Sequence, residues 1–178
     1  HTRLQGDWSS DVCSSDLLAF SGANFVDDND AQAIANMKYG SEAHERLQTL
    51  IKNSTNNLYK TTKINSVETE VEIKNEYPPI RGFIDLVMDW DGINVIGEIK
   101  TAKQEVWDTK QSEMAPSTNH MLQILTYMKL KEVDEGFFVY ENKNTQELLI
   151  MPIQMTEKNK AVIDELFIWF CEIGRAHV

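Results

Sequence analysis

The sequence predicts an α/β domain built on a mixed, mainly antiparallel sheet. Apolar residues recur at helical spacing in three separate stretches, and strand-like alternation or apolar runs lie between them. An Asp91-Gly92 pair flanked by two apolar runs is the strongest short-range signal of a β-hairpin. The resulting order of helix, three strands, helix, two strands and helix is an α/β pattern in which helices flank a central sheet.

The elements follow one another with recognisable boundaries. Pro78-Pro79 separates the first strand from the hairpin, and Ser117 or Thr118 can cap the middle helix. The polar segment 102–116, in which Trp107 stands alone among charges, is expected to be a loop or a weak helix. The expected elements are a helix at 29–53, a strand at 68–76, the hairpin at 80–101, a helix ending at Lys131, strands at 136–141 and 147–154, and a helix at 156–171.

The two ends of the chain are set apart from this fold. Residues 1–17 and 172–178 resemble translated sequencing-library adapter, so we exclude both as artefacts. Residues 18–171 are then expected to form a single domain that is truncated at both ends. Cys171 is the only cysteine of that segment, which is consistent with a reducing cytoplasm. One cysteine cannot hold an iron–sulfur cluster by itself, so we expect no such cluster within this fragment.

Charge narrows the classes of partner. The chain carries 17 basic and 28 acidic residues, a net charge of −11. Net acidity argues mildly against a nucleic-acid partner, since phosphate binding usually leaves a basic footprint. A local footprint is still present in five lysines that follow the hairpin or close the next helix, although solvated lysines would fit the sequence equally well. They are Lys100, Lys103, Lys110, Lys129 and Lys131. No apolar run approaches the ~20 residues of a membrane span, so no membrane partner is expected.

The hairpin brings two carboxylates together. If its turn has two residues, opposed residues have numbers that add to 183, which places Asp85 opposite Glu98 with Cβ atoms about 5 Å apart. Like charges in this position destabilise a sheet unless something positive lies between them, and a divalent cation is the obvious candidate. Lys100 follows Glu98 by two residues and points to the same face.

Chance alone often produces an acidic residue followed by Glu-x-Lys, and exposed strand faces are commonly charged. The apolar residues around the triplet argue instead that the hairpin is central and covered. Ile84, Leu86 and Met88 are expected to form one apolar face. Charged groups in such a place need partners or a function.

Four short motifs extend this pattern along the chain. They are Gly40-x-x-x-His44 on the first helix, Gly82-x-Ile-Asp85 and Glu98-x-Lys100 on the hairpin, and Gln123-x-x-x-Tyr127 on the middle helix. In this order, and on these elements, they resemble the PD-(D/E)xK, or restriction-endonuclease-like, nuclease superfamily and within it the RecB-like exonuclease clade. The resemblance spans Met37 to Leu130. The Pro-Asp form of the second motif is absent here, which is common in this clade.

The resemblance implies a restriction-endonuclease-like core of order αβββαβ, with an extra strand and a C-terminal helix. It implies metal-dependent hydrolysis of phosphodiester bonds in DNA, with an exonuclease as the expected form. Mg²⁺ or Mn²⁺ would be held by His44, Asp85, Glu98 and the backbone carbonyl of Ile99. Lys100 would orient or help deprotonate the attacking water, Gln123 would help orient the site, and Tyr127 would contact the DNA backbone.

The implied setting is DNA repair, recombination or phage DNA processing in the cytoplasm of a bacterium or of a phage-infected host. A helicase or recombinase could act as partner or as a fused domain. The polarity of digestion, the preference for single or double strands, exonuclease versus endonuclease action and the oligomeric state stay open.

Three other functions fit parts of the pattern. A non-catalytic nucleic-acid-binding module of a larger repair protein would keep the fold, although the complete set of polar residues argues against it. A glycosidase with paired carboxylates would need neither Lys100 nor His44. A structural interaction domain would show no effect of metal on stability.

Single residues of the motifs also have ordinary structural explanations. A lone histidine on an apolar helix face is more often a core residue, and Gln123 with Tyr127 also fits ordinary helix amphipathicity.

Overall fold

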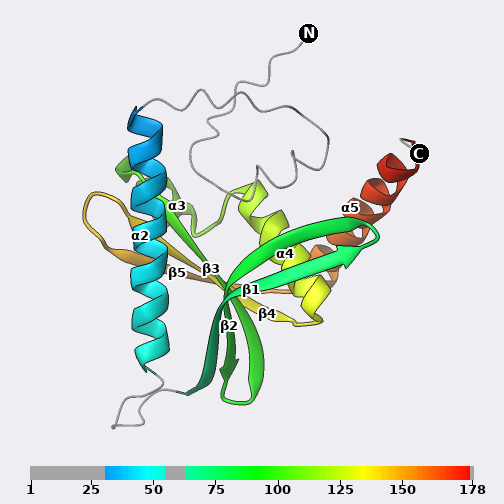
Figure 1. The fold of residues 1–178 in the computed structure, drawn as a ribbon, viewed down its shortest axis with the longest axis horizontal. Coiled ribbons are helices and arrows are strands. Elements are labelled where there is room, and N and C mark those ends of the chain that lie inside the picture. Colours follow the sequence, from blue (N-terminus) through cyan, green and yellow to red (C-terminus); the bar gives the residue numbers. More distant parts are fainter. Residues whose placement is uncertain (1–30, 55–62, 177–178) are drawn as a thin grey trace.

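The computed structural model describes residues 31–54 and 63–176, which form a five-stranded sheet flanked by helices (Figure 1). The elements are α2 (Ala31–Ser54), β1 (Ile64–Glu76), β2 (Pro79–Trp90), β3 (Ile93–Ala102), α3 (Gln104–Glu113), α4 (Thr118–Lys131), β4 (Glu135–Asn142), β5 (Leu148–Gln154) and α5 (Glu157–Ala176). The strand order is β1-β2-β3-β4-β5, with β3 and β4 parallel and the other neighbours antiparallel. The predicted fold class is confirmed. The excluded segment 1–17 lies outside the described residues.

The hairpin turn has the expected backbone. Asp91 has a φ of 55° and Gly92 a φ of 89°, and two positive φ values are what a two-residue turn between twisted strands requires. The pairs that follow include Leu86 with Gly97 and Met88 with Val95. Their numbers add to 183, so the predicted register of β2 and β3 is confirmed over these pairs.

In the middle of β1 and β2, the side chains switch the face of the sheet to which they point. Regular pairing occupies residues 66–69 and 71–76 of β1, and Glu70 between them has a φ of 52°. Ile84 packs in the cluster that contains α4 and α5, whereas Leu86 and Met88 pack with Leu47 of α2. The prediction that Ile84, Leu86 and Met88 share one face was therefore wrong. On the neighbouring β1, the left-handed Glu70 lies between the partners of Leu86 and Ile84, and the alternation of period two on which that prediction depended breaks at this point.

The sheet is covered on both sides (Figure 1). The smaller cluster lies under α2, and the larger one lies under α4 and α5 and includes Ile124, Phe138 and Ile163. Segment 102–116 contains a helix, α3, whose Trp107 is 3% exposed and belongs to the larger cluster. Because most neighbours of Trp107 in the sequence are charged or polar, its burial is not evident from the sequence. Among the described residues, no helix is both long and apolar enough to cross a membrane.

Helix α2 is fastened to β4 by a buried carboxylate. Glu141 is 0% exposed, and its Oε1 accepts a hydrogen bond of 3.0 Å from the hydroxyl of Tyr39. Its Oε2 pairs with the guanidinium of Arg46. Because Tyr39 and Arg46 both belong to α2, these contacts fix the helix across the sheet.

Candidate functional site

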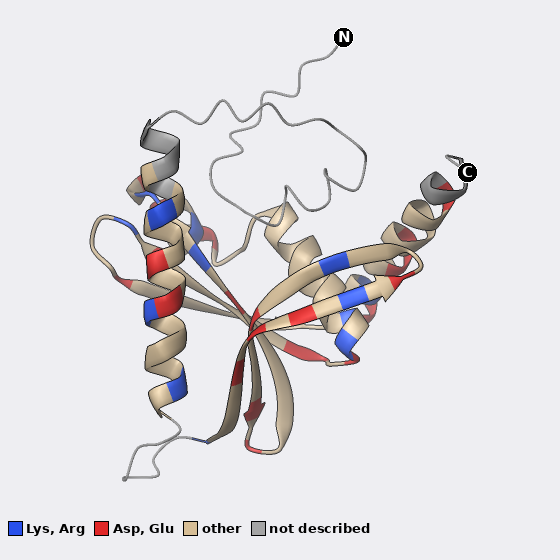
Figure 2. Ribbon diagram, viewed as in Figure 1, with Lys and Arg blue, Asp and Glu red and all other residues tan. Residues whose placement is uncertain are grey.

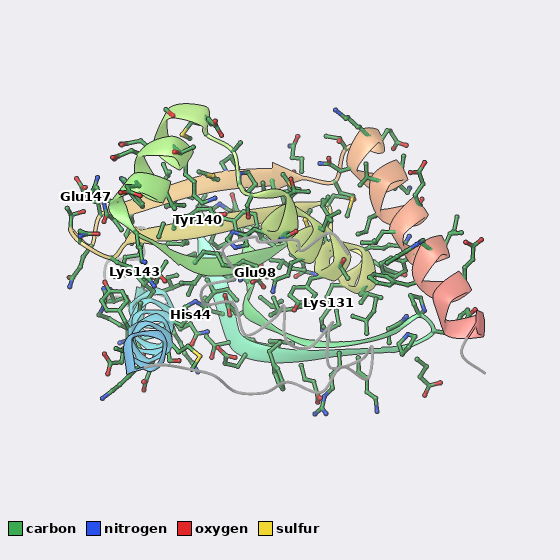
Figure 3. The ribbon with its side chains drawn as sticks, turned by 90° about the horizontal axis from the view of Figure 1, so that it is seen from above. His44, Glu98, Lys131, Tyr140, Lys143 and Glu147 are labelled. Atoms are coloured by element: carbon green, nitrogen blue, oxygen red, sulfur yellow. The ribbon has the colours of Figure 1, made fainter. Side chains whose placement is uncertain are left out.

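His44 of α2 lies beside Asp85 of β2. Figure 3 labels His44 on α2 together with Glu98 of β3. The His44 Nδ1 atom lies 3.4 Å from Asp85 Oδ1, and the two side chains are 28% and 11% exposed. The second oxygen of Asp85, Oδ2, accepts a hydrogen bond of 2.7 Å from the backbone N–H of Ile99. The Asp85 carboxylate therefore joins α2, β2 and β3 at one point.

The side chains of Glu98 and Lys100 lie side by side on β3, and both are buried. Lys100 Nζ lies 3.3 Å from Glu98 Oε2, and the side chains are 5% and 1% exposed. Burial raises the pKa of Glu98 to about 8; Lys100 opposes this shift and the charge of Asp85 adds to it. The other oxygen, Oε1, is buried and has no hydrogen-bond partner among the described residues. Such an oxygen is unfavourable by itself, and a ligand cation would satisfy it.

Glu70 of β1 joins the site, although no motif in the sequence indicates it. The ligand atoms of His44, Glu70 and Asp85 all lie within 4.8 Å of one another. In the sequence, Glu70 belongs to a strand of alternating glutamates, SVETEVEIK, which is typical of a solvated strand face. No spacing signal distinguishes Glu70 from Glu68 or Glu72. The position of the Glu70 side chain depends on the left-handed backbone of this residue, where the side chains of β1 switch from one face of the sheet to the other.

The predicted metal ligands are brought together in part. His44 and Asp85 are in contact, and the Asp85 charge acts on Glu98, but the tight group of ligand atoms contains Glu70 instead of Glu98. The Ile99 side chain is fully buried in the core under α2, and its N–H is used by Asp85. The ligand roles of Glu98 and of the Ile99 carbonyl stay predictions.

The glycine and tyrosine of two separate motifs fit each other. A Cβ atom on Gly82 would lie 2.5 Å from the Tyr127 hydroxyl oxygen, so the strand needs glycine where α4 presents this ring. Gln123 Nε2 donates to the same hydroxyl at 3.4 Å. Tyr127 is 5% exposed and belongs to the larger core. The absence of a side chain at Gly82 thus makes room for the Tyr127 ring. The predicted contact of Tyr127 with DNA stays a prediction.

The lysines that follow the hairpin have different surroundings. Lys110 is 7% exposed, and its ammonium lies 4.5 Å from the centroid of the Tyr140 ring. Lys129 pairs with Asp164 of α5, and Lys131 is exposed. Figure 2 shows Lys and Arg distributed over α2, α3 and the paired strands β1 and β2, with acidic residues between them. The lysines that follow the hairpin are thus distributed over several elements and have different partners.

Comparison with known protein families and sequences gives a distant match. No family model matches the chain. An uncharacterized protein of Mycoplasma genitalium is 24% identical over 108 residues, which cover 53% of this chain and 38% of that protein. The chain therefore spans well under two thirds of that relative's length.

Solved structures resemble most of the chain. The alkaline exonuclease LHK-Exo from Laribacter hongkongensis has a TM-score of 0.61 at 15% identity, covering 92% of this chain and 78% of that one. LHK-Exo in complex with dAMP gives 0.60 at 16% identity with the same coverage. The crystal structure of SSO0001 gives 0.53 at 19% identity, covering 88% and 71%. This chain has the fold of these structures.

Proposed function

We propose that this chain is a metal-dependent DNA nuclease that acts as an exonuclease, and that it belongs to the RecB-like clade of the PD-(D/E)xK superfamily. The observation that supports this most is the convergence of His44, Glu70 and Asp85 beside the buried Glu98–Lys100 pair. This convergence occurs in a fold shared with an alkaline exonuclease.

The donor set fits a hard divalent cation. Carboxylate oxygens with one imidazole suit Mg²⁺ or Mn²⁺, and the buried Glu98 Oε1 has no hydrogen-bond partner among the described residues. His44, Glu70, Asp85, Glu98 and the Ile99 carbonyl would hold the cation. When bound, it would polarise the scissile phosphate and lower the pKa of a coordinated water.

The surrounding side chains would complete the hydrolysis. Lys100 lies beside Glu98, where its ammonium would orient the attacking water and offset negative charge in the transition state. Water adds to phosphorus, the bond to the leaving oxygen breaks, and a proton passes to that oxygen. Gln123 and Tyr127 would help to orient the site and the DNA backbone.

The resemblance extends the proposal to the biological setting. It favours DNA repair, recombination or phage DNA processing in a bacterial or phage-infected cytoplasm. DNA would be the substrate, and a helicase or recombinase would act as partner or as a fused domain.

The test is degradation of end-labelled linear DNA and covalently closed circular DNA by the full chain, with Mg²⁺, Mn²⁺ or a chelator. We expect loss of linear DNA only, which needs the metal and falls on the order of 100-fold or more in Lys100→Ala. The matched control is Lys160→Ala, an exposed lysine of α5. DNA binding without cleavage under every metal would identify a binding module instead. Cleavage by Lys100→Ala at the wild-type rate would reject the assigned site.

A further inference from the structure

We infer that Gln48 is a positioning residue, which aims the Glu70 carboxylate into the metal site and thereby sets the affinity of that site for a divalent cation. The inference rests on the proposed function, because it assumes that His44, Glu70 and Asp85 hold a metal. It concerns a residue that touches the ligands and not the metal itself.

The contacts of Gln48 converge on the two strands of the site. Gln48 is 8% exposed and follows His44 by four residues, so both side chains leave the same face of α2. Its Nε2 donates to Glu70 Oε1 at 2.6 Å and to the backbone carbonyl of Asp85 at 3.1 Å. An amide nitrogen carries two hydrogens, so these two acceptors occupy its full donor capacity.

The two acceptors lie where β1 and β2 change faces. Glu70 has a φ of 52°, a backbone conformation that a non-glycine residue adopts only when its surroundings hold it there. The Asp85 carbonyl lies at the same interruption, where a buried carbonyl needs a donor. One side chain thus satisfies the backbone of β2 and tethers the carboxylate of β1.

The tether has a direct consequence for metal binding. Glu70 is exposed, so without a fixed partner its side chain would sample several rotamers and would lose that freedom on binding a cation. A hydrogen bond from Gln48 to Oε1 holds the carboxylate beside His44 and Asp85 before the cation arrives. Partners of this kind typically change metal affinity by about 10- to 100-fold.

The chemistry of position 48 is specific. A carboxylate there would repel Glu70 and leave the Asp85 carbonyl without a donor, and a hydrocarbon would leave both acceptors without a donor. Methionine has nearly the shape of glutamine but no donor. Gln48→Met therefore removes the two hydrogen bonds with little change in packing volume.

The test is calorimetric titration of the DNA-free full chain with Mn²⁺, in a double-mutant cycle of Gln48→Met and Glu70→Ala. We expect Gln48→Met to weaken Mn²⁺ binding by about 10-fold in the wild-type background and by less than about twofold in the Glu70→Ala background. The matched control is Gln154→Met, because Gln154 is an exposed glutamine whose Nε2 donates to Glu135 Oε1 at 3.3 Å. This control should bind Mn²⁺ as the wild type does.

The outcomes separate this inference from the proposed function. Equal weakening in both backgrounds would mean that Gln48 acts through general packing, and no weakening would mean that Glu70 needs no tether; either result overturns the inference. Coupling between residues 48 and 70 in a protein that binds Mn²⁺ but does not degrade DNA would support the inference and reject the nuclease. Failure of the wild type to bind Mn²⁺ would overturn both.

Discussion

Two glutamates are fully buried on neighbouring parallel strands, and their surroundings are opposite in kind. Glu141 of β4 has a donor on each oxygen, from Tyr39 and from Arg46. Glu98 of β3 has Lys100 near one oxygen, while the other has no hydrogen-bond partner among the described residues. Both carboxylates have the same chemistry and nearly the same exposure, 0% and 1%.

This difference distinguishes a glutamate that holds the fold together from a glutamate that is available to bind a ligand. A buried polar group whose partners are complete adds rigidity and fixes one arrangement of the chain. Glu141 does this for α2, the helix that presents His44 and Gln48. A buried group with incomplete partners is unfavourable until a ligand completes it. We propose that Glu98 is kept in that state for the cation, and that the well-satisfied Glu141 holds α2, and with it His44, in place.

The largest expected effect is on cleavage. Glu98→Gln keeps the shape of the side chain but removes a proposed metal ligand, so we expect DNA degradation to fall on the order of 1000-fold. Glu141→Gln should reduce it by less than about 10-fold at a temperature at which the variant stays folded. Initial rates with Mn²⁺, normalised to the folded fraction measured by circular dichroism, check both. Equal losses in the two variants would remove the distinction between holding and binding.

The next effect is on stability. Arg46→Ala leaves the Glu141 carboxylate buried without its charged partner, and we expect the free energy of unfolding to fall by about 3 kcal/mol. This is the lower end for a broken buried pair, because Arg46 is 44% exposed. Arg81→Ala is the control, since it breaks the Arg81–Glu72 pair on the exposed surface and should lose less than about 1 kcal/mol. Urea denaturation at pH 7 measures both. A loss in Arg46→Ala as small as in the control would mean that Glu141 does not anchor α2.

The smallest effect is the change in stability for each single unit of pH. The pKa of Glu98 is raised to about 8 in the folded chain against 4.5 for the unperturbed group, so between these pH values the folded state binds more protons than the unfolded state. Stability of the metal-free protein should therefore fall as pH rises through this window, by at most about 1.4 kcal/mol per pH unit from this group. Comparison of unfolding midpoints in urea at pH 5, 6, 7 and 8 checks the slope.

Two variants isolate the contribution of Glu98 to that slope. Glu98→Gln should lose it, since the amide does not titrate. Glu165→Gln, on an exposed position of α5, should keep it. If Glu98→Gln retained the wild-type slope, another group would be responsible and Glu98 would resemble Glu141 in the metal-free protein.

Much of the frame was predictable because it depends on local signals. The Asp91-Gly92 turn fixed the register of β2 and β3, and apolar spacing located α2, α4 and α5 to within a few residues. Helix α3 was less predictable, since its buried residues are a single tryptophan, Trp107, and a lysine, Lys110. The prediction that Ile84 and Leu86 share an apolar face was wrong, because no residue pattern indicates that a glutamate on the neighbouring strand has a left-handed backbone.

The site divides in the same way. Asp85, Glu98 and Lys100 could be proposed from the sequence because one hairpin with a fixed register carries all three, and His44 was added by the resemblance. Glu70 and Gln48 could not be found, since both are ordinary residues for a solvated strand and an amphipathic helix.

The sequence by itself determined the α/β order of elements and the register of the hairpin. It also determined that a carboxylate and a lysine, Glu98 and Lys100, lie two residues apart on β3. These depend on periodicity and turn chemistry, which act over a few residues. Only the tertiary structure decided which acidic residue of β1 joins His44 and Asp85, which buried glutamate is satisfied, and which amide holds the site. Those outcomes depend on where distant segments meet and on which polar atoms are left without partners when they do, and residue spacing along the chain does not record either.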